Sequence, residues 1–351
     1  MKRKWIAIFL IMTGFILGLS AFQQPPPLSR QLDIDTLKAK FPANFPKPVY
    51  DFESNPVTQA GFELGKTLFY APLLSSDQSV SCSSCHRPSG AFSNFDVPLS
   101  SGVKGCKGER NAPPLFNLIW QKELMWDGRI SNLEEVPLNA LTNPCEMNNN
   151  MNSILNVLQR EPIYPPLFEK AFGHQTITTQ RLLNALTQFT SMMISANSKY
   201  DKFIRKEEGG KFSEEEQTGY RLFKEQCSGC HTEPLFTDGS YRNNGLDIVS
   251  KDRGRDSLTN LASDKGKFRV PSLRNIEITK PYMHDGRFSS LKQVLQQYTN
   301  DVKNHANLDP LLKKDGKIGI RLTQPQQTQL IAFLKTLTDV DFINDRRFNN
   351  H

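Results

Sequence analysis

The chain has 351 residues, with 43 Lys and Arg against 36 Asp and Glu, so its formal net charge is +7 and its pI is about 9.0. This length has room for two domains. Three positive charges lie in residues 2–4, and the +4 that remains without them is too small to indicate a partner. Because no basic cluster with interleaved aromatic residues occurs, the composition argues against a nucleic acid-binding protein.

The first 21 residues have the layout of a secretory signal. A basic start precedes an apolar run from Trp5 to about Phe22, and the small residues at its end resemble a cleavage site. An uncleaved membrane anchor is the alternative, because about 18 apolar residues can just cross a bilayer. We therefore predict that residues 1–21 direct export and are either removed or kept as an anchor.

Helical periodicity dominates after a Pro-rich segment at residues 22–55, which we expect to wrap the surface. Apolar residues recur at three- and four-residue steps, whereas alternating strand patterns are scarce. The helices predicted in this way are Thr58–Phe69, Asn150–Gln159, Thr179–Ser195, Ser213–Glu225, Ser290–Tyr298 and Gln324–Leu337. Ser213 and Thr323 have the sequence context of helix starts. The predicted fold class is all-α.

Two runs have the form Cys-x-x-Cys-His, at which c-type haem is attached. They consist of Cys82, Cys85 and His86 in the first run and Cys227, Cys230 and His231 in the second. The thiols bind the haem vinyl groups and the imidazole ligates the iron. A zinc site would bring two Cys pairs together over about 15–20 residues, whereas 140 residues separate these runs. We predict two covalently bound haems and, because such haem is attached on the exported side of a bacterial membrane, a periplasmic protein.

Sequence blocks around the two runs repeat in the same order. The repeated blocks are 64–69 and 218–223, 110–117 and 269–275, and 125–133 and 283–291. Two haem domains related by internal duplication are the simplest account. We therefore predict cytochrome c-like domains over 56–205 and 206–345, with the boundary in the charged stretch Lys199–Lys211.

These blocks together resemble bacterial dihaem cytochrome c peroxidases over roughly residues 56–340. The matching motifs begin at Leu64, Cys82, Arg110, Trp126, Asn143, Cys227, Val270, Pro281 and Ala332. The same superfamily includes the dihaem oxidase that matures methylamine dehydrogenase, and the motifs do not separate the two. The resemblance implies that the N-terminal haem reacts with hydrogen peroxide. It also implies that the C-terminal haem accepts electrons from a small c-type cytochrome or cupredoxin.

The resemblance gives two residues a role in the reaction. Glu146 stands in the block where the family keeps its distal acid/base, and a carboxyl in an apolar haem cavity should have a raised pKa that suits proton transfer. Alternatively, Glu146 merely caps the helix that starts near Met151. Trp126 resembles the family's tryptophan between the haems, which is either an electron relay or ordinary aromatic packing.

At the two positions where the family places the iron ligand opposite the proximal histidine, this chain differs from many members. Many members cap the N-terminal haem with a histidine where this chain has Val103, so we predict a five-coordinate or water-bound iron at rest. The sixth ligand of the second haem falls on Tyr298, where other peroxidases have methionine and the maturation oxidase has tyrosine. Met283, His284 and His305 are alternatives, and Tyr298 as a core aromatic is another.

The family also binds calcium between its domains. The matching positions are Asn111, Thr279 and Pro281, which would offer oxygen ligands. Two cysteines outside the haem runs, Cys106 and Cys145, fall in the blocks that should line the peroxide pocket. An exported location favours a disulfide between them, and free buried thiols are the alternative.

Three functions follow from these observations. The first is a dihaem cytochrome c peroxidase, for which the family suggests a homodimer. The second is a dihaem oxidase of the methylamine-dehydrogenase-maturation type that acts on a protein or a small molecule. The third is an electron-transfer dihaem cytochrome in which Glu146 has no catalytic role.

Overall fold

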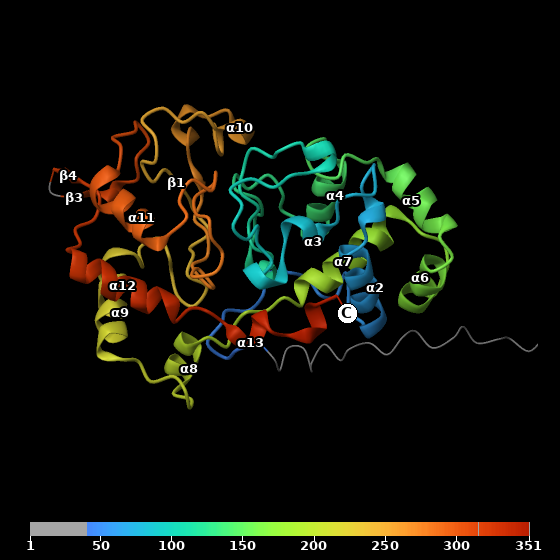
Figure 1. The fold of residues 1–351 in the computed structure, drawn as a ribbon, viewed down its shortest axis with the longest axis horizontal. Coiled ribbons are helices and arrows are strands. Elements are labelled where there is room, and N and C mark those ends of the chain that lie inside the picture. The colour runs from blue at the N-terminus through green and yellow to red at the C-terminus, as the bar shows by residue number, and fades with distance from the viewer. Residues whose placement is uncertain (1–40, 315, 351) are drawn as a thin grey trace, which may run out of the picture.

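The computed structural model describes residues 41–314 and 316–350 of the chain. The predicted signal or anchor at residues 1–21, and the Pro-rich segment up to residue 40, lie outside the described residues. Two helical lobes lie next to each other along the long axis of the molecule (Figure 1). Within residues 41–314 and 316–350, no helix is long and apolar enough to span a membrane.

The N-terminal lobe contains most of the helices of the first half of the chain. Its helices are α2 (Gln59–Phe69), α3 (Cys82–Cys85), α4 (Glu135–Thr142), α5 (Met151–Arg160), α6 (Tyr164–Phe172) and α7 (Thr179–Ser191). Single 3-10 turns lie at η1 (Pro72–Leu74), η2 (Pro88–Gly90), η3 (Val103–Gly105) and η4 (Leu118–Trp120).

The C-terminal lobe combines helices with two small antiparallel sheets, which the prediction of an all-α fold leaves out. Its helices are α8 (Lys199–Arg205), α9 (Glu214–Gln226), α10 (Asp256–Thr259), α11 (Leu291–Gln296) and α12 (Gln324–Lys335), with 3-10 turns η5 (Ala262–Asp264) and η7 (Pro310–Leu312) and a π turn η6 (Gln297–Asp301). Strand β1 (Tyr241–Arg242) pairs with β2 (Phe268–Arg269), and β3 (Lys313–Lys314) pairs with β4 (Lys317–Ile318).

Each of the six predicted helices is present, and the differences lie at their ends. The helix predicted to reach Ser195 ends at Ser191, and α11 ends at Gln296 before the chain continues as the π turn. The predicted starts are confirmed, because Ser213 and Thr323 both form capping boxes at the first turns of α9 and α12. The apolar periodicity does not predict α4, α6 and α8, which are short.

Each lobe is built on one close helix pair, α2 against α7 and α9 against α12. Both pairs cross at a glycine. A Cβ atom at Gly65 would lie 1.9 Å from the Ala185 carbonyl oxygen, and one at Gly219 would lie 1.9 Å from the Gln329 carbonyl oxygen. Glycine is therefore required at both positions, because any side chain would force the helices apart.

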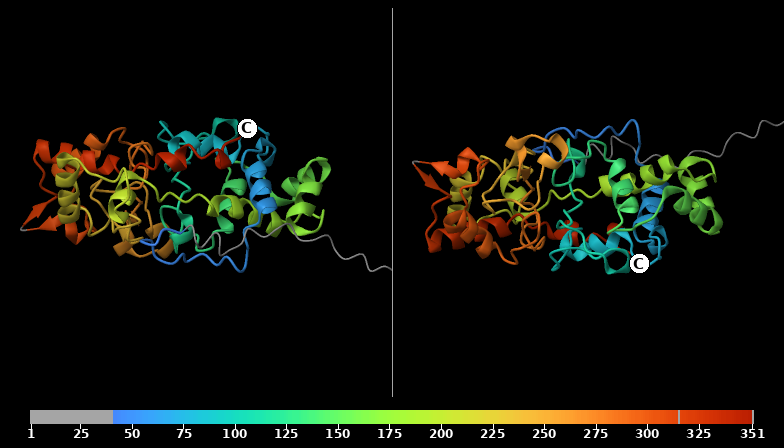
Figure 2. Two further views of the ribbon diagram at one scale, coloured as in Figure 1. Left: turned by 90° about the horizontal axis from the view of Figure 1, so that it is seen from below. Right: turned by 90° about the horizontal axis from the view of Figure 1, so that it is seen from above.

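The first apolar core includes residues from the C-terminal end of the chain, and the second includes a residue within the predicted boundary stretch Lys199–Lys211. Tyr200 on α8 packs in the second core with Phe236, whereas Phe342 and Phe348 near the C-terminus pack in the first core. Phe342 lies on α13 (Val340–Ile343) and Phe348 on the turn η8 (Arg346–Phe348). The end of the chain thus returns to the N-terminal lobe beside α2, as the views of Figures 1 and 2 agree.

The return of the C-terminus should stabilise the N-terminal lobe. The Phe348 ring is only 2% exposed and lies against Phe62, Phe92 and Phe189. We expect Phe348→Ala to lower the free energy of unfolding by about 3–5 kcal/mol, because it leaves a cavity in a packed aromatic cluster. Denaturant unfolding of the holoprotein measures this loss. Val340→Ala is the control, since that side chain is 59% exposed, and equal stability of the two variants would contradict the expectation.

Candidate haem and peroxide site

The first haem run lies on α3 and positions its imidazole through a backbone hydrogen bond. Cys82 and Cys85 are one helical turn apart, and His86 follows directly. The His86 Nδ1 atom lies 3.0 Å from the Phe92 carbonyl oxygen, to which its N–H can donate. Burial lowers the pKa of His86 to about 4. A neutral imidazole whose Nδ1–H is engaged presents Nε2 to iron, which is the arrangement that a haem ligand requires.

The second haem run repeats this arrangement at the end of α9. His231 Nδ1 lies 3.2 Å from the Phe236 carbonyl oxygen and 3.1 Å from that of Pro271. Burial also lowers the pKa of His231. Phe92 and Phe236 both adopt left-handed backbone conformations, with φ of 60° and 55°. The chain therefore turns in the same way after each histidine to bring a carbonyl to the ring.

The four thiols of these runs fit covalent haem attachment better than zinc binding. Burial raises the pKa of Cys82 and of Cys227 to about 12, and it also raises the pKa of Cys85 and Cys230. A structural zinc site needs four ligands, mostly Cys or His, at one position. No group of three or more His, Cys, Asp or Glu side chains in the described part of the chain converges on a common metal position.

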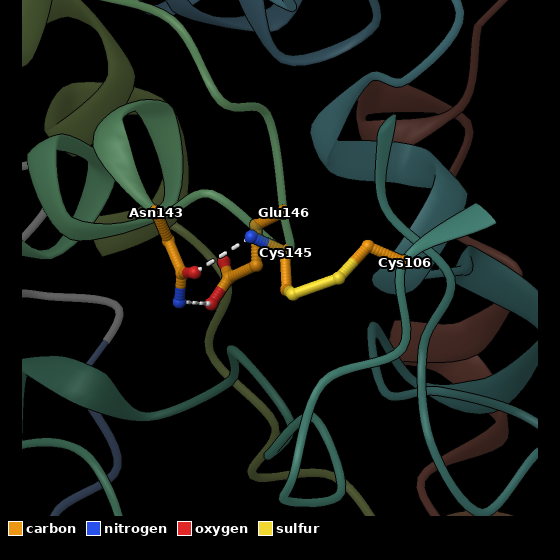
Figure 3. Close-up of a disulfide and its surroundings, with 4 residues drawn as sticks. All are labelled: Cys106, Asn143, Cys145 and Glu146. Atoms are coloured by element: carbon orange, nitrogen blue, oxygen red, sulfur yellow. Dashed lines mark hydrogen bonds between the residues drawn. A yellow bond between two sulfur atoms is a disulfide. The ribbon is translucent and has the colours of Figure 1, made fainter. Parts of the chain in front are cut away.

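The Glu146 carboxyl lies close to the first haem run. Burial raises its pKa, and its charge in turn contributes to the raised pKa of Cys82 and Cys85. Asn143 Nδ2 donates a hydrogen bond of 2.8 Å to Glu146 Oε1, which acts in the opposite direction and lowers the pKa (Figure 3). The sequence reasoning missed Asn143, although this asparagine opens the same motif as Glu146.

The alternative role for Glu146, as the cap of the following helix, belongs to another residue. Asn150 is the N-cap of α5, and its side chain accepts a hydrogen bond of 2.9 Å from the Ser153 amide. The Glu146 carboxyl points instead to Asn143. Glu146 is therefore not the cap of α5.

A disulfide joins the loop that carries Val103 to the segment that carries Glu146. Cys106 and Cys145 are bonded, with their Cα atoms 4.9 Å apart (Figure 3). The Val103 amide donates a hydrogen bond of 2.8 Å to the Glu146 carbonyl oxygen. A Cβ atom at Gly102 would lie 2.3 Å from the Cys145 carbonyl oxygen, so the two segments touch through their backbones. The Val103 side chain is buried and has no atom that can ligate iron.

Two candidates for the sixth ligand of the second haem meet at one amide. Asn244 Nδ2 lies 3.5 Å from both the Tyr298 hydroxyl oxygen and the Met283 sulfur. Burial raises the pKa of Tyr298, and the Cys227 and Cys230 thiols add to this effect, which puts the phenol near the second haem run. Asn244 could not be predicted from the sequence, because nothing in its local pattern relates it to residue 298.

The two histidines considered for this ligand are engaged elsewhere. The His284 ring stacks on Phe268 with centroids 3.8 Å apart. His305 Nδ1 accepts a hydrogen bond of 2.9 Å from the Asn307 amide. Neither interaction involves the Tyr298 and Met283 side chains, and all four residues remain candidates for the sixth ligand.

Trp126 lies where the two lobes meet. Its Nε1 donates a hydrogen bond of 2.8 Å to the Asn111 carbonyl oxygen, and its own carbonyl oxygen accepts one of 2.8 Å from the Arg269 amide. The Asn111 amide in turn donates to the His284 carbonyl oxygen at 2.7 Å. The Trp126 backbone is thus bonded to the C-terminal lobe, while its indole is bonded to Asn111 of the N-terminal lobe.

The predicted calcium positions come to one region of this interface. The Asn111 side chain donates to the Pro98 carbonyl oxygen at 2.9 Å. The segment that contains Thr279 and Pro281 packs on the same loop, since the Asp96 amide donates to the Lys280 carbonyl oxygen at 3.2 Å. Asn111, Thr279 and Pro281 therefore share one neighbouring segment.

Comparison with known proteins identifies the family. Residues 59–209 match the family described as di-haem cytochrome c peroxidase, and residues 216–338 match cytochrome c. The methylamine utilization protein MauG of Methylophilus methylotrophus is 33% identical over 305 residues, which cover 86% of this chain and 88% of that protein. The chain belongs to the dihaem cytochrome c peroxidase family. It is therefore a haem peroxidase, an oxidoreductase with two c-type haems.

Other relatives agree with this placement in the dihaem peroxidase family. The cytochrome c551 peroxidase of Nitrosomonas europaea is 33% identical over 282 residues, which cover 79% of each chain. A solved structure of a MauG-like protein associated with microbial copper homeostasis has a TM-score of 0.81 and 30% identity, covering 88% of this chain and 98% of that one. The dihaem peroxidase BthA of Burkholderia thailandensis shares the fold, with a TM-score of 0.69 and 23% identity.

The Cys106–Cys145 disulfide should contribute to stability. It closes a loop with a sequence separation of 39 residues. Loss of such a cross-link should lower the free energy of unfolding by about 3–4 kcal/mol, because the unfolded chain gains conformational entropy. We expect the double variant Cys106→Ser, Cys145→Ser to lose this amount in denaturant unfolding of the holoprotein. Non-reducing alkylation and intact mass give the second measurement, and a wild-type protein that takes up two alkyl groups would refute the bridge.

Proposed function

We propose that this peroxidase reduces hydrogen peroxide to two waters at the haem held by His86, using two protons and two electrons that arrive through the haem held by His231. The buried Glu146 carboxyl beside the first haem run carries this proposal. Peroxidases among the relatives, such as that of Nitrosomonas europaea, support it.

Proton transfer in this mechanism falls to the protein. Cys82, Cys85 and His86 would hold the first haem, which would supply an iron centre for peroxide and the electrons that reduce the O–O bond. Glu146 as a carboxylate accepts the proton of the near oxygen and donates it to the far oxygen, which leaves as water. His86 keeps its ring fixed through the Phe92 carbonyl oxygen. The Cys106–Cys145 bridge holds the loop that bounds the cavity.

Electron delivery is the task proposed for the C-terminal lobe. The donor is a small c-type cytochrome or a cupredoxin, and Trp126 relays electrons between the lobes, since its backbone carbonyl oxygen bonds to Arg269 of the C-terminal lobe and its indole to Asn111 of the N-terminal lobe. The matching turns and helix pairs of the two lobes support an origin by duplication. We further place the enzyme in the periplasm, as a homodimer, with a calcium ion held near Asn111, Thr279 and Pro281.

Removal of the Glu146 carboxylate tests the proposal. Glu146→Gln keeps the size of the side chain but leaves no group to accept the proton, so peroxide reduction should slow by about 10²- to 10⁴-fold while both haem spectra persist. Rapid mixing of the reduced holoprotein with peroxide and reduced cytochrome c measures the rate. Glu135→Gln, on the exposed side of α4, is the matched control. Wild-type turnover in Glu146→Gln would remove Glu146 from the mechanism.

A second candidate function is favoured by Tyr298. An oxidase of the MauG type would use peroxide to oxidise a protein or small-molecule substrate, and it would not need turnover with a cytochrome donor. The proximity of Tyr298 to the second haem run and the similarity to MauG of Methylophilus methylotrophus support this candidate. Fast reaction with peroxide but no oxidation of reduced cytochrome c or cupredoxin would favour the oxidase over the peroxidase.

Replacement of the Tyr298 phenol tests its proposed bond to iron. An anionic phenolate stabilises ferric iron, so Tyr298→Phe should raise the reduction potential of the second haem, by on the order of 0.1 V. Spectroelectrochemical titration of the holoprotein measures the potential, and electron paramagnetic resonance reports the change of ligand. An unchanged potential and an unchanged spectrum would show that Tyr298 is not a ligand and would leave Met283, His284 and His305 as the candidates.

A further inference from the structure

We propose that Asn143 is a positioning residue for Glu146, whose side-chain amide fixes the orientation of the carboxyl and helps to keep it ionised. The inference rests on the acid/base role proposed above for Glu146. It assigns a function to a neutral residue that does not itself have to touch peroxide or haem.

The contacts of Asn143 occupy both ends of its amide (Figure 3). Nδ2 donates to Glu146 Oε1 at 2.8 Å, and Oδ1 accepts from the Cys145 amide at 3.0 Å. The Asn143 carbonyl oxygen also accepts from the amides of Glu146 and Asn148, at 3.0 and 2.9 Å. Asn143 is itself anchored as the C-cap of α4. One residue thus shapes the turn and orients the carboxyl within it.

The backbone on the other side of Glu146 is equally constrained. The disulfide to Cys106 holds Cys145, and the Val103 amide holds the Glu146 carbonyl oxygen at 2.8 Å. Because the backbone is fixed from both sides, the position of the carboxyl depends on its side-chain torsions. The hydrogen bond from Asn143 selects among these torsions, so that the carboxyl is in place before peroxide enters.

The same hydrogen bond controls ionisation. Burial disfavours the charged form of Glu146 and raises its pKa, whereas donation by Asn143 stabilises the carboxylate and lowers it. The titratable side chains that face Glu146 among the described residues are Cys82 and Cys85, which carry no charge once they are thioethers. Only the carboxylate can accept a proton from peroxide. The value of kcat/KM for peroxide should fall at low pH as Glu146 becomes protonated, and we call this fall the acid limb. Loss of the hydrogen bond from Asn143 should move the acid limb to higher pH.

Two substitutions separate positioning from shaping of the turn. Asn143→Asp is isosteric and can still accept from the Cys145 amide, but it replaces the donor to Glu146 with a like charge. Asn143→Leu removes both interactions. Asn152→Leu, at an exposed position on α5, is the matched control for the change of residue type.

The first measurement is kcat/KM for peroxide as a function of pH, made on the holoproteins. We expect Asn143→Asp and Asn143→Leu to move the midpoint of the acid limb up by about one to two pH units, equivalent to a 10- to 100-fold loss below the limb. We expect Asn152→Leu to match the wild type. The second measurement is an infrared pH titration of the carboxyl band of Glu146, assigned by its absence in Glu146→Gln, and its midpoint should shift by the same amount.

The outcomes distinguish this inference from the proposed function. If Glu146→Gln is inactive but Asn143→Asp keeps the wild-type acid limb and infrared midpoint, Asn143 only shapes the turn and the positioning role is wrong. If Glu146→Gln keeps wild-type turnover, the proposed acid/base role fails, and with it the positioning role in catalysis. A shifted midpoint in both measurements, together with an inactive Glu146→Gln, establishes the inference.

Discussion

A buried polar network around Ser195 fixes the two lobes relative to each other. The Ser195 amide donates to the Asn117 side chain, and Asn117 donates back to the Ser195 carbonyl oxygen, both at 2.9 Å. From the other lobe, Asn275 donates to the Ser195 hydroxyl, which donates to Asp339, and Arg274 donates to the same carbonyl oxygen. These groups are buried, and a shift of either lobe would leave several without partners. The network therefore fixes how the N-terminal lobe meets the C-terminal lobe.

The network also shows how two similar lobes are joined without being equivalent. Asn117 and Asn275 occupy matching positions of the repeated blocks, and both have left-handed backbones with φ of 58° and 56°. Both asparagines bind Ser195, which lies at the crossing between the lobes and in neither repeat. Arg274 adds a fully buried ion pair with Asp201. Because burying two charges is costly, such a pair specifies one geometry more than it adds net stability.

Local patterns account for the parts of this protein that sequence could predict. The haem runs, the six periodic helices and the capping boxes at Ser213 and Thr323 depend on neighbours within a few residues. The return of Phe348 to the first core and the contact of Asn244 with Tyr298 join residues far apart in the chain. No periodicity encodes such contacts, because tertiary packing decides them. For the same reason Asn143 could be read as part of a motif, but its hydrogen bond to Glu146 could not.

The proposed division of proton and electron chemistry between the lobes would let each be adjusted separately. In the first lobe, burial raises the pKa of Glu146 and the hydrogen bond from the Asn143 amide lowers it. In the second lobe, burial raises the pKa of Tyr298 and the hydrogen bond from the Asn244 amide lowers it. An amide donates a hydrogen bond without adding charge, so it favours an anionic oxygen while the field at the haem stays nearly unchanged. A charged residue at position 143 or 244 would shift both the pKa of the nearby acidic group and the reduction potential of a bound haem. The two properties could then not be adjusted independently.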